Sequence, residues 1–292
     1  MSARFDRYLT LSLFRPLRQA GWMNGEQSIP VLMYHSISDD AEEKVQPYYR
    51  LATSPRRFAE QMQWLRDLGF HGVSLEEALA GLADGKAGQG PLAAITFDDG
   101  FRDFYTEAWP VIQQHGFTAT VYLPTAFIGP QRKLFHGKEC LTWDEARELR
   151  RHGIRFGSHT VNHPKLYELD WAAIADELAD SKKNIEQELG GEITSFAYPY
   201  AFPQEDQNFT KRFSGLLRGQ GYQSCATTVV GRVQAGDDLY RMKRLPANSC
   251  DDAALFAAKL AGDYDWLSVF QRGYRTFKRY GQKNPRLVRA EF

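Results

Sequence analysis

The chain has 292 residues, 43% of them hydrophobic, which is enough apolar material for one large domain or two small ones. Its 36 basic and 36 acidic residues balance, but unevenly along the chain. Residues 1–20 carry four Arg and one Asp (+3), residues 271–292 carry seven Lys or Arg and one Glu (+6), and the residues between them therefore carry −9. An acidic middle is unlike the charge distribution of a nucleic-acid-binding protein, and we expect no nucleic-acid partner.

The sequence favours a reducing compartment. Its cysteines form no Cys-x-x-Cys pair, which argues against a disulfide framework or a thiolate metal site. Residues 1–29 lack a secretory pattern, because the apolar run at 8–14 is short and an Arg-Pro pair follows it directly. No stretch approaches the roughly 18 apolar residues of a membrane span. We therefore expect a cytoplasmic protein.

Both basic ends interleave charges with aromatic or aliphatic residues, as in residues 272–280, RGYRTFKRY. Such segments lie on anionic membrane surfaces in some proteins and are ordinary solvated helix faces in others. The sequence leaves both interpretations open, so peripheral contact with the inner face of the membrane is a hypothesis.

Strand and helix signals alternate from residue 30 onward. The expected strands are residues 30–35, 70–73, 92–97, 118–123, 154–158, 195–198 and 223–227. N-cap residues and capping boxes predict helices that begin near residues 54, 74, 142 and 170, and two more are expected at 106–115 and 210–219. We expect a helix interrupted near Pro16, a long loop at 125–141, and two late helices at 251–261 and 265–280.

This alternation favours a parallel sheet, and about seven strand–helix units favour an α/β barrel. We divide the chain into an N-terminal arm (1–29), a catalytic domain (30–250) and a basic C-terminal helical extension (251–292). In such barrels the active site lies at the C-terminal ends of the strands. The polar residues found at or just after the expected strand ends are His35, Asp98, Asp99, His159, His163 and Tyr198.

An apolar strand ends in two carboxylates at residues 94–100, AITFDDG. Adjacent residues at a strand end point in different directions, so one carboxylate can bind a cation while its neighbour accepts a proton. Taken alone, an Asp-Gly pair after a strand is more often a simple turn signal.

Residues 158–163, SHTVNH, follow another short apolar run. On a helical turn the four-residue spacing of His159 and His163 places both imidazoles on one face. Together with Asp99 they make the three-ligand pattern of a catalytic metal site that keeps one position open for water.

These segments resemble the polysaccharide deacetylases, that is, carbohydrate esterase family 4 with the NodB-homology fold. The matching motifs occur in the family's order at residues 96–100 (TFDDG), 158–163 (SHTVNH) and 196–200 (FAYPY), and the resemblance covers roughly residues 30–250. It implies a distorted (β/α)7 TIM-like barrel with extra helices at both ends. It also implies metal-dependent hydrolysis of N-acetyl groups from an amino sugar in a polysaccharide or a lipid-linked saccharide precursor.

The resemblance implies a role for each motif residue. The metal ligands are Asp99, His159 and His163, and the metal is usually Zn²⁺, with Co²⁺ or Ni²⁺ as substitutes. Asp98 is the general base, and the backbone N–H of Tyr198, next to Pro199 in the substrate site, stabilises the oxyanion together with the metal.

The acid that protonates the departing amine is less obvious, because no histidine follows His163. Most family members use a histidine from a late motif. The subset that resembles the poly-N-acetylglucosamine deacetylases instead uses a Tyr-His motif on the first strand, which residues 34–35 match. We therefore predict His35 as the acid. The alternative is a histidine that only forms hydrogen bonds at the barrel mouth.

Two features around the site stay open. Ala197 stands where many family members carry an arginine that tunes the base, so the sequence does not name the group that sets the pKa of Asp98. Trp143 and Leu141 are candidates for an apolar wall around the acyl methyl group, although Trp143, beside a capping box, also fits simple helix packing.

Other functions were weighed against deacetylation. A non-catalytic carbohydrate-binding protein on this scaffold would be expected to lose its base or a ligand, and a deformylase or O-acetyl esterase remains an alternative. A paired-carboxylate glycosidase is excluded, because its two carboxylates stand about 5 Å or more apart across the scissile bond. The sequence does not identify the sugar, the acyl group, the native metal or the oligomeric state.

Overall fold

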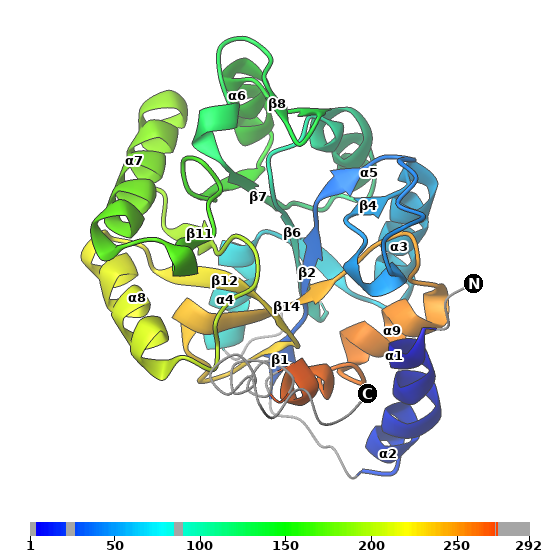
Figure 1. Ribbon diagram of the computed structural model, residues 1–292. Helices are drawn as coiled ribbons and strands as arrows, with labels where there is room; N and C mark the ends of the chain where they lie inside the picture. The colour runs from blue at the N-terminus through cyan, green and yellow to red at the C-terminus, as the bar shows by residue number, and fades with distance from the viewer. Residues whose placement is uncertain (1–3, 22–26, 85–89, 272, 274–292) are drawn as a thin grey trace.

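The computed structural model describes residues 4–21, 27–84, 90–271 and 273. Within that part of the chain, seven parallel strands close into a barrel, and the last of them pairs back with the first. Their order around the barrel is β2 (Val31–Tyr34), β14 (Met242–Pro246), β12 (Ser224–Val230), β11 (Ser195–Ala197), β10 (Arg155–Ser158), β7 (Thr120–Leu123) and β6 (Leu92–Phe97) (Figure 1). A short strand, β5 (His71–Val73), pairs with the N-terminal half of β6. The predicted distorted (β/α)7 barrel is confirmed.

Helices surround this barrel (Figure 1). They are α3 (Pro55–Asp67), α4 (Leu75–Ala83), α5 (Trp109–Gln114), α6 (Trp143–Arg151), α7 (Trp171–Leu189) and α8 (Gln207–Gly219). The predicted capping is confirmed: the Ser54 hydroxyl accepts from the backbone of α3, and both α4 and α6 begin with complete capping boxes. Short polar signals therefore fix where these helices begin.

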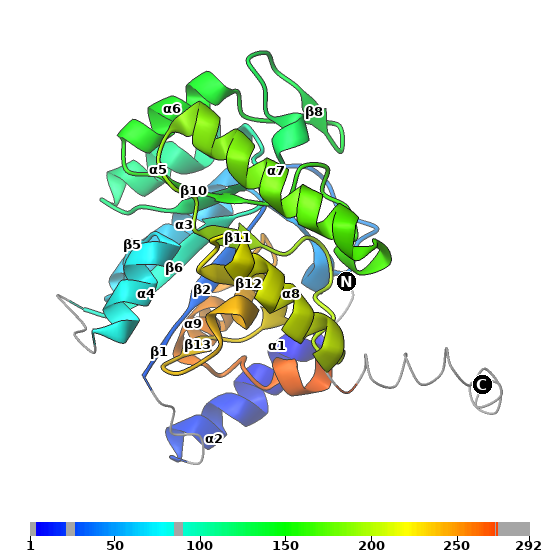
Figure 2. The same ribbon diagram turned by 90° about the vertical axis from the view of Figure 1, so that its left-hand side faces the viewer.

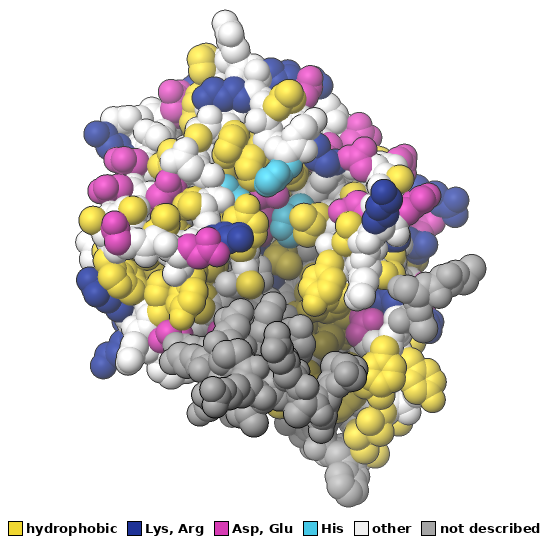
Figure 3. Space-filling view, in the orientation of Figure 1, with side chains coloured by type: hydrophobic (Ala, Val, Ile, Leu, Met, Phe, Trp, Pro, Cys, Tyr) yellow, Lys and Arg dark blue, Asp and Glu magenta, His cyan; other side chains and the backbone are white. Residues whose placement is uncertain are grey.

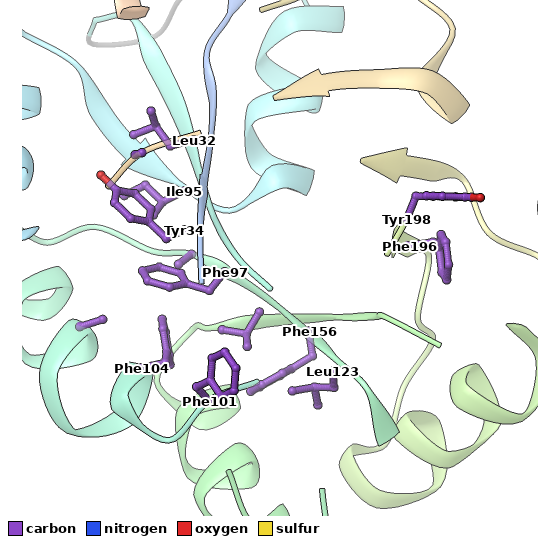
Figure 4. Close-up of a cluster of buried hydrophobic side chains, with 14 of the residues drawn as sticks. Leu32, Tyr34, Ile95, Phe97, Phe101, Phe104, Leu123, Phe156, Phe196 and Tyr198 are labelled. Atoms are coloured by element: carbon purple, nitrogen blue, oxygen red, sulfur yellow. The ribbon is translucent and has the colours of Figure 1, made fainter. Parts of the chain in front are cut away.

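Aromatic side chains fill the space between the barrel and its helices (Figure 4). The Phe97 ring lies 5.3 Å from the Tyr34 ring, 5.7 Å from Phe58 and 4.7 Å from Phe104. Each such pair contributes about 0.5–1.5 kcal/mol beyond the apolar area it buries. The buried Tyr34 hydroxyl donates to Gln61 Oε1 at 2.8 Å, so this polar atom is satisfied. The core thus holds rigid the two strands that carry His35 and Asp98.

The prediction that residues 223–227 are the last strand was wrong, because β14 closes the barrel. β14 has five residues, contains Arg244 and ends in Pro246. Because β14 contains charged residues and ends in proline, the pattern of apolar residues does not predict a buried strand here.

One other local prediction was also wrong. The helical run continues through Pro16 as α1 (Phe5–Leu9), π-helical turns at Thr10–Phe14 and α2 (Arg15–Gln19). The wider π-helical backbone directly before Pro16 accommodates a ring that would clash with the carbonyl four residues earlier. The helix expected at 106–115 is confirmed, although it begins two residues earlier, with π-helical turns at Phe104–Ala108 before α5.

Short elements complete the fold. The loop expected at 125–141 contains a 3₁₀ turn at Thr125–Phe127 and a hairpin of β8 (Leu134–Phe135) and β9 (Lys138–Glu139). Two further two-stranded sheets pair β1 (Ser28–Ile29) with β13 (Val233–Gln234), and β3 (Ser36–Ile37) with β4 (Ala52–Thr53).

The N-terminal helices pack against α9 (Ala253–Ala261) and the residues after it (Figure 2). The Trp266 ring stacks on Phe14 at 4.8 Å, and its Nε1 donates to Thr10 Oγ1 at 3.0 Å. Trp64 of α3 contacts Phe256 of α9, with ring centroids 6.0 Å apart. The two ends of the described chain therefore form one layer attached to the barrel.

Most of the basic charge of the N-terminal arm is paired within the protein. Arg4, Arg7 and Arg18 form ion pairs with acidic residues at 251, 252 and 263. Nearly all of the basic stretch at 272–292, including half of the helix expected at 265–280, lies outside the described residues. No helix in the part of the chain that the structure describes is long and apolar enough to cross a membrane. Contact of the termini with a membrane surface stays a prediction.

We expect Asp251→Asn to lower the free energy of unfolding by about 3–5 kcal/mol, because the buried Asp251 carboxylate accepts from Arg4 (2.9 Å) and Lys259 (2.7 Å). The variant leaves the buried Lys259 without its ion-pair partner and leaves Arg4 with Asp6 alone. Asp252→Asn is the matched control. Its half-exposed pair with Arg7 contributes about 1 kcal/mol or less, and asparagine keeps the N-cap of α9. Urea unfolding compares the two variants, and equal losses would contradict a special role for the buried pair.

Candidate active site

Three side chains meet at the C-terminal ends of the barrel strands. Asp99 follows β6, and His159 and His163 lie in the loop after β10. Asp99 Oδ1 is 3.5 Å from His159 Nε2 and 3.4 Å from His163 Nε2. One potential ligand atom of each residue lies within 4.8 Å of the other two. Figure 3 shows histidine side chains gathered in a hollow near the centre of this face.

The cluster fits a divalent cation. Asp99 Oδ1 is buried, and no group in the described residues forms a hydrogen bond to it, which is unusual for a carboxylate oxygen. His159 Nδ1 contacts the Ala197 carbonyl oxygen at 2.7 Å, and donation of its proton there leaves the Nε2 lone pair facing Asp99. Bonds of about 2.0–2.1 Å to a tetrahedral ion separate ligand atoms by about 3.3 Å, close to the distances found here.

Electrostatics around the cluster favour the ligand forms of His163 and Asp99. Burial, together with the neighbouring His159, lowers the pKa of His163 to about 3, so this imidazole is neutral. Burial alone would raise the pKa of Asp99, but the His159 imidazole 3.5 Å away and the other imidazoles around it lower this pKa. Burial would likewise lower the pKa of His159, and the two carboxylates outweigh burial and raise it. The cluster thus attracts positive charge.

The loops of the cluster have unusual backbone conformations. Among the described residues, five non-glycine residues have positive φ, and four of them lie in these loops: Asp99 (71°), Thr160 (71°), His163 (53°) and Tyr200 (57°). Our premise that residues 159–163 form a helical turn was therefore wrong. Left-handed residues fold the loop back, and this fold brings the two imidazoles together. Such conformations cost about 1–3 kcal/mol each and occur preferentially at functional sites.

Asp98 has a separate environment from its neighbour. Its carboxylate receives two parallel hydrogen bonds of 2.7 Å from the guanidinium of Arg244, which is fully buried on β14. Arg244 also donates to the Thr227 carbonyl oxygen at 2.9 Å and to Thr96 Oγ1 at 3.3 Å. Burial would raise the pKa of Asp98, but the Arg244 charge outweighs it and holds this pKa well below its usual range.

Arg244 is the functional residue that the sequence analysis missed. The open question of what replaces the arginine expected at position 197 has a structural answer, because Arg244 reaches Asp98 from a different strand. The one available signal was a charged residue directly before Leu245-Pro246 in the sequence MKRLP. Charged residues are almost never fully buried unless they are paired.

His35 lies beside this pair at the end of β2. Its Nε2 is 3.8 Å from Asp98 Oδ2, and its side chain keeps 16% of its surface exposed. The structure therefore places the predicted base and the predicted acid side by side, next to the three-residue cluster.

The expected oxyanion donor was misplaced. The backbone N–H of Tyr198 donates to the Ala226 carbonyl oxygen at 2.9 Å and so belongs to the barrel ladder. Pro199 has no N–H, and the next donor along the loop is the N–H of Tyr200, which has no hydrogen-bond partner among the described residues. The Tyr200 ring lies 4.7 Å from the His163 ring, so this residue borders the cluster.

The two residues proposed for the acyl wall lie in the core. Leu141 is fully buried, and Trp143, in the first turn of α6, is 6% exposed. Neither borders the cavity that lies beside His35. Trp143 is accordingly accounted for by helix packing, the alternative considered for it.

Comparison with known proteins agrees with this geometry. The polysaccharide deacetylase family model matches residues 85–217. YxkH of Bacillus subtilis (strain 168), which has a provisional polysaccharide deacetylase name, is 29% identical over 241 residues, or 82% of this chain and 79% of YxkH. The chain is thus similar to the polysaccharide deacetylases.

Relatives with more specific names are also similar to this chain. The poly-β-1,6-N-acetyl-D-glucosamine N-deacetylase of Staphylococcus aureus (strain MSSA476) is 24% identical over 204 residues, or 65% of this chain and 69% of that protein. The structure of the Streptococcus pyogenes deacetylase PplD in complex with acetate superposes with a TM-score of 0.69 at 25% identity, covering 80% of this chain and 99% of PplD. Over that 80% the chain therefore has the fold of a solved deacetylase.

We expect Arg244→Met to lower the free energy of unfolding of the chelator-treated protein by about 3–5 kcal/mol at pH 7, because Asp98 is left charged and buried. In the wild type the depressed pKa of Asp98 adds stability above the unfolded value near pH 4, and this stability is lost as the pH falls. In the variant, burial raises the pKa, so protonation relieves the unpaired charge. The loss should therefore shrink between pH 7 and pH 5.

Urea unfolding at the two pH values measures this effect. The double variant Asp98→Asn/Arg244→Met is the control, and at pH 7 it should be more stable than Arg244→Met alone. A loss that does not depend on pH would contradict the assigned pair.

Proposed function

We propose that this protein hydrolyses the N-acetyl group of an amino sugar within a polysaccharide, with a divalent cation as cofactor. The main supporting observation is that two adjacent carboxylates have different surroundings. Asp99 faces two imidazoles with an unpartnered oxygen, whereas Asp98 is held by Arg244 and lies 3.8 Å from His35. The names of the S. aureus and S. pyogenes relatives support the same class of reaction.

The residues of the chain supply positioning and proton transfer. When bound at Asp99, His159 and His163, a divalent cation supplies Lewis acidity toward an amide carbonyl and makes water more acidic. Asp98, kept ionised by Arg244, accepts a proton from the attacking water. The backbone N–H of Tyr200 is placed to stabilise the oxyanion that forms.

Cleavage of an amide also needs an acid, because an amide anion is a very poor leaving group. His35 Nε2 holds a proton next to Asp98 and delivers it to the departing nitrogen. An ester needs no such acid, and this difference separates N-deacetylation from the O-acetyl esterase alternative. A non-catalytic carbohydrate-binding role is less well supported, since the base, the acid and all three potential ligands are present together.

The reaction is tested by measuring acetate and formate release from N-acylated sugar oligomers, including a lipid-linked saccharide, with zinc-loaded protein and a chelated control. We expect acetate release that requires the metal. Asp98→Asn should lower the rate about 10²–10⁴-fold because it removes the base. Its zinc content, measured by mass spectrometry, should stay unchanged. Undiminished turnover in this variant would refute the assigned role of Asp98.

His35→Ala separates the two acyl-transfer reactions. We expect amide hydrolysis to fall about 10²–10⁴-fold, while hydrolysis of an activated acetate ester falls much less, because the ester's leaving group needs no protonation. His71→Asn is the matched control, since His71 is an exposed histidine at the start of β5, beside the N-terminal end of β6 and therefore at the barrel end away from the site. Equal losses for amide and ester would show that His35 is not the acid.

A further inference from the structure

A cavity of about 210 Å³ lies beside His35. Met33 of β2, Val230 of β12 and Pro246 of β14 contribute to its wall, so it opens at the same barrel end as the catalytic residues. It is smaller than the roughly 300–1,000 Å³ typical of sites for drug-sized ligands, and it therefore suits one ring-sized group.

Tyrosines give this cavity its chemical character. Tyr48, Tyr49 and Tyr200 all line it, and the rings of Tyr48 and Tyr49 meet edge to face at 4.8 Å. Tyr49 is 63% exposed and Tyr200 is 44% exposed, which is unusual for two large rings at the mouth of one cavity. Flat aromatic faces beside polar groups are suited to a sugar ring, which has an apolar C–H face and polar edges.

The loop that carries Tyr48 and Tyr49 is fixed in place. Asn248 Nδ2 donates to the carbonyl oxygens of Pro47 and Arg50, at 2.9 and 3.1 Å, on either side of the two tyrosines. Arg50 also lines the cavity, and its guanidinium donates to the Val45 carbonyl oxygen at 3.2 Å. Within the described chain no carboxylate pairs with Arg50, so it keeps N–H donors for a ligand.

The C-terminal segment completes the wall. Gln271 Nε2 donates to the Tyr48 hydroxyl at 3.0 Å, and Gln271 Oε1 accepts from the Val230 N–H at 2.9 Å. Thr228, also on β12, donates from its Oγ1 to the Tyr200 carbonyl oxygen at 3.0 Å. These lining residues are therefore preorganised, which lowers the entropic cost of binding.

The position of the cavity determines which part of a substrate it holds. His35, which borders it, protonates the departing nitrogen in the proposed reaction, so the cavity lies on the amine side of the scissile bond. The amine side of an N-acetylated amino sugar is the sugar itself. Tyr200 connects the cavity to the cluster. It lines the cavity, and its ring lies 4.7 Å from the ring of His163 in the cluster.

We propose that this cavity is a sugar subsite, in which Tyr49 stacks on a pyranose ring on the amine side of the scissile amide and Gln271 of the C-terminal segment holds the wall. The proposal rests on the proposed deacetylation and makes a glycan, rather than a small amide, the substrate. It assigns to the C-terminal segment a direct part in the substrate site.

The test uses Tyr49→Leu, which removes the aromatic face and keeps an apolar side chain. With an N-acetylglucosamine oligomer, we expect KM to rise about 2–13-fold, the equivalent of 0.5–1.5 kcal/mol, and kcat to stay within about twofold. Hydrolysis of a sugar-free activated acetate ester should be unchanged. Tyr8→Leu is the matched control, since Tyr8 is 65% exposed on α1, outside the cavity. Gln271→Leu should raise KM in the same direction.

Binding measured by calorimetry keeps the test independent of turnover. The oligomer should bind Asp98→Asn more tightly than Asp98→Asn/Tyr49→Leu, even if wild-type protein releases no acetate, in which case the proposed function fails and the subsite stands. Equal affinities would overturn the subsite. A wild-type KM that falls as the N-acyl chain is lengthened would also overturn it, because the cavity would then hold the acyl side.

Discussion

The buried ion pair between Arg244 and Asp98 constrains the rest of the site. A guanidinium without exposed surface is tolerated only when an anion and further acceptors satisfy it, since burial of an unpaired charge costs several kcal/mol. The anion lies 146 residues earlier in the sequence, and the two meet only because β14 and β6 both pair with β2. The strand pairing that closes the barrel therefore also orients the base, Asp98.

This pair also separates the duties of two neighbouring carboxylates. The Asp98 carboxylate accepts hydrogen bonds from Arg244, whereas the carboxylate of Asp99, whose backbone φ is 71°, faces the two imidazoles. Gly100 follows with φ 60°, and a Cβ there would lie 2.9 Å from a Leu123 methyl group. Glycine is thus required by both conformation and space. The barrel core compensates for the strain that these loops store.

Much of this architecture could be predicted from local signals. Capping residues such as Ser54 mark helix starts, and the strand that precedes Asp98 and Asp99 is apolar at every position except Thr96. The fold class and the clustering of polar residues at the strand ends followed from these signals. The role of Arg244 could not be predicted, because its partner, Asp98, is distant in sequence and because the strand that carries Arg244 has no apolar pattern. The oxyanion donor was misassigned for a related reason, since only the ladder bond of Tyr198 shows that its N–H is occupied.

The ends of the chain bear on function more directly than their sequence indicated. Residues 251–292 were expected to form a basic helical extension, and its composition suggested contact with a membrane surface. In the structure, Trp266 ties this segment to the N-terminal helices, and Gln271 then reaches Tyr48 and Val230 at the rim of the cavity beside His35. The packing of the two chain ends therefore positions one wall of the cavity. The layer that these ends form is connected to the barrel mouth through the hydrogen bonds of Gln271 rather than through the catalytic residues themselves.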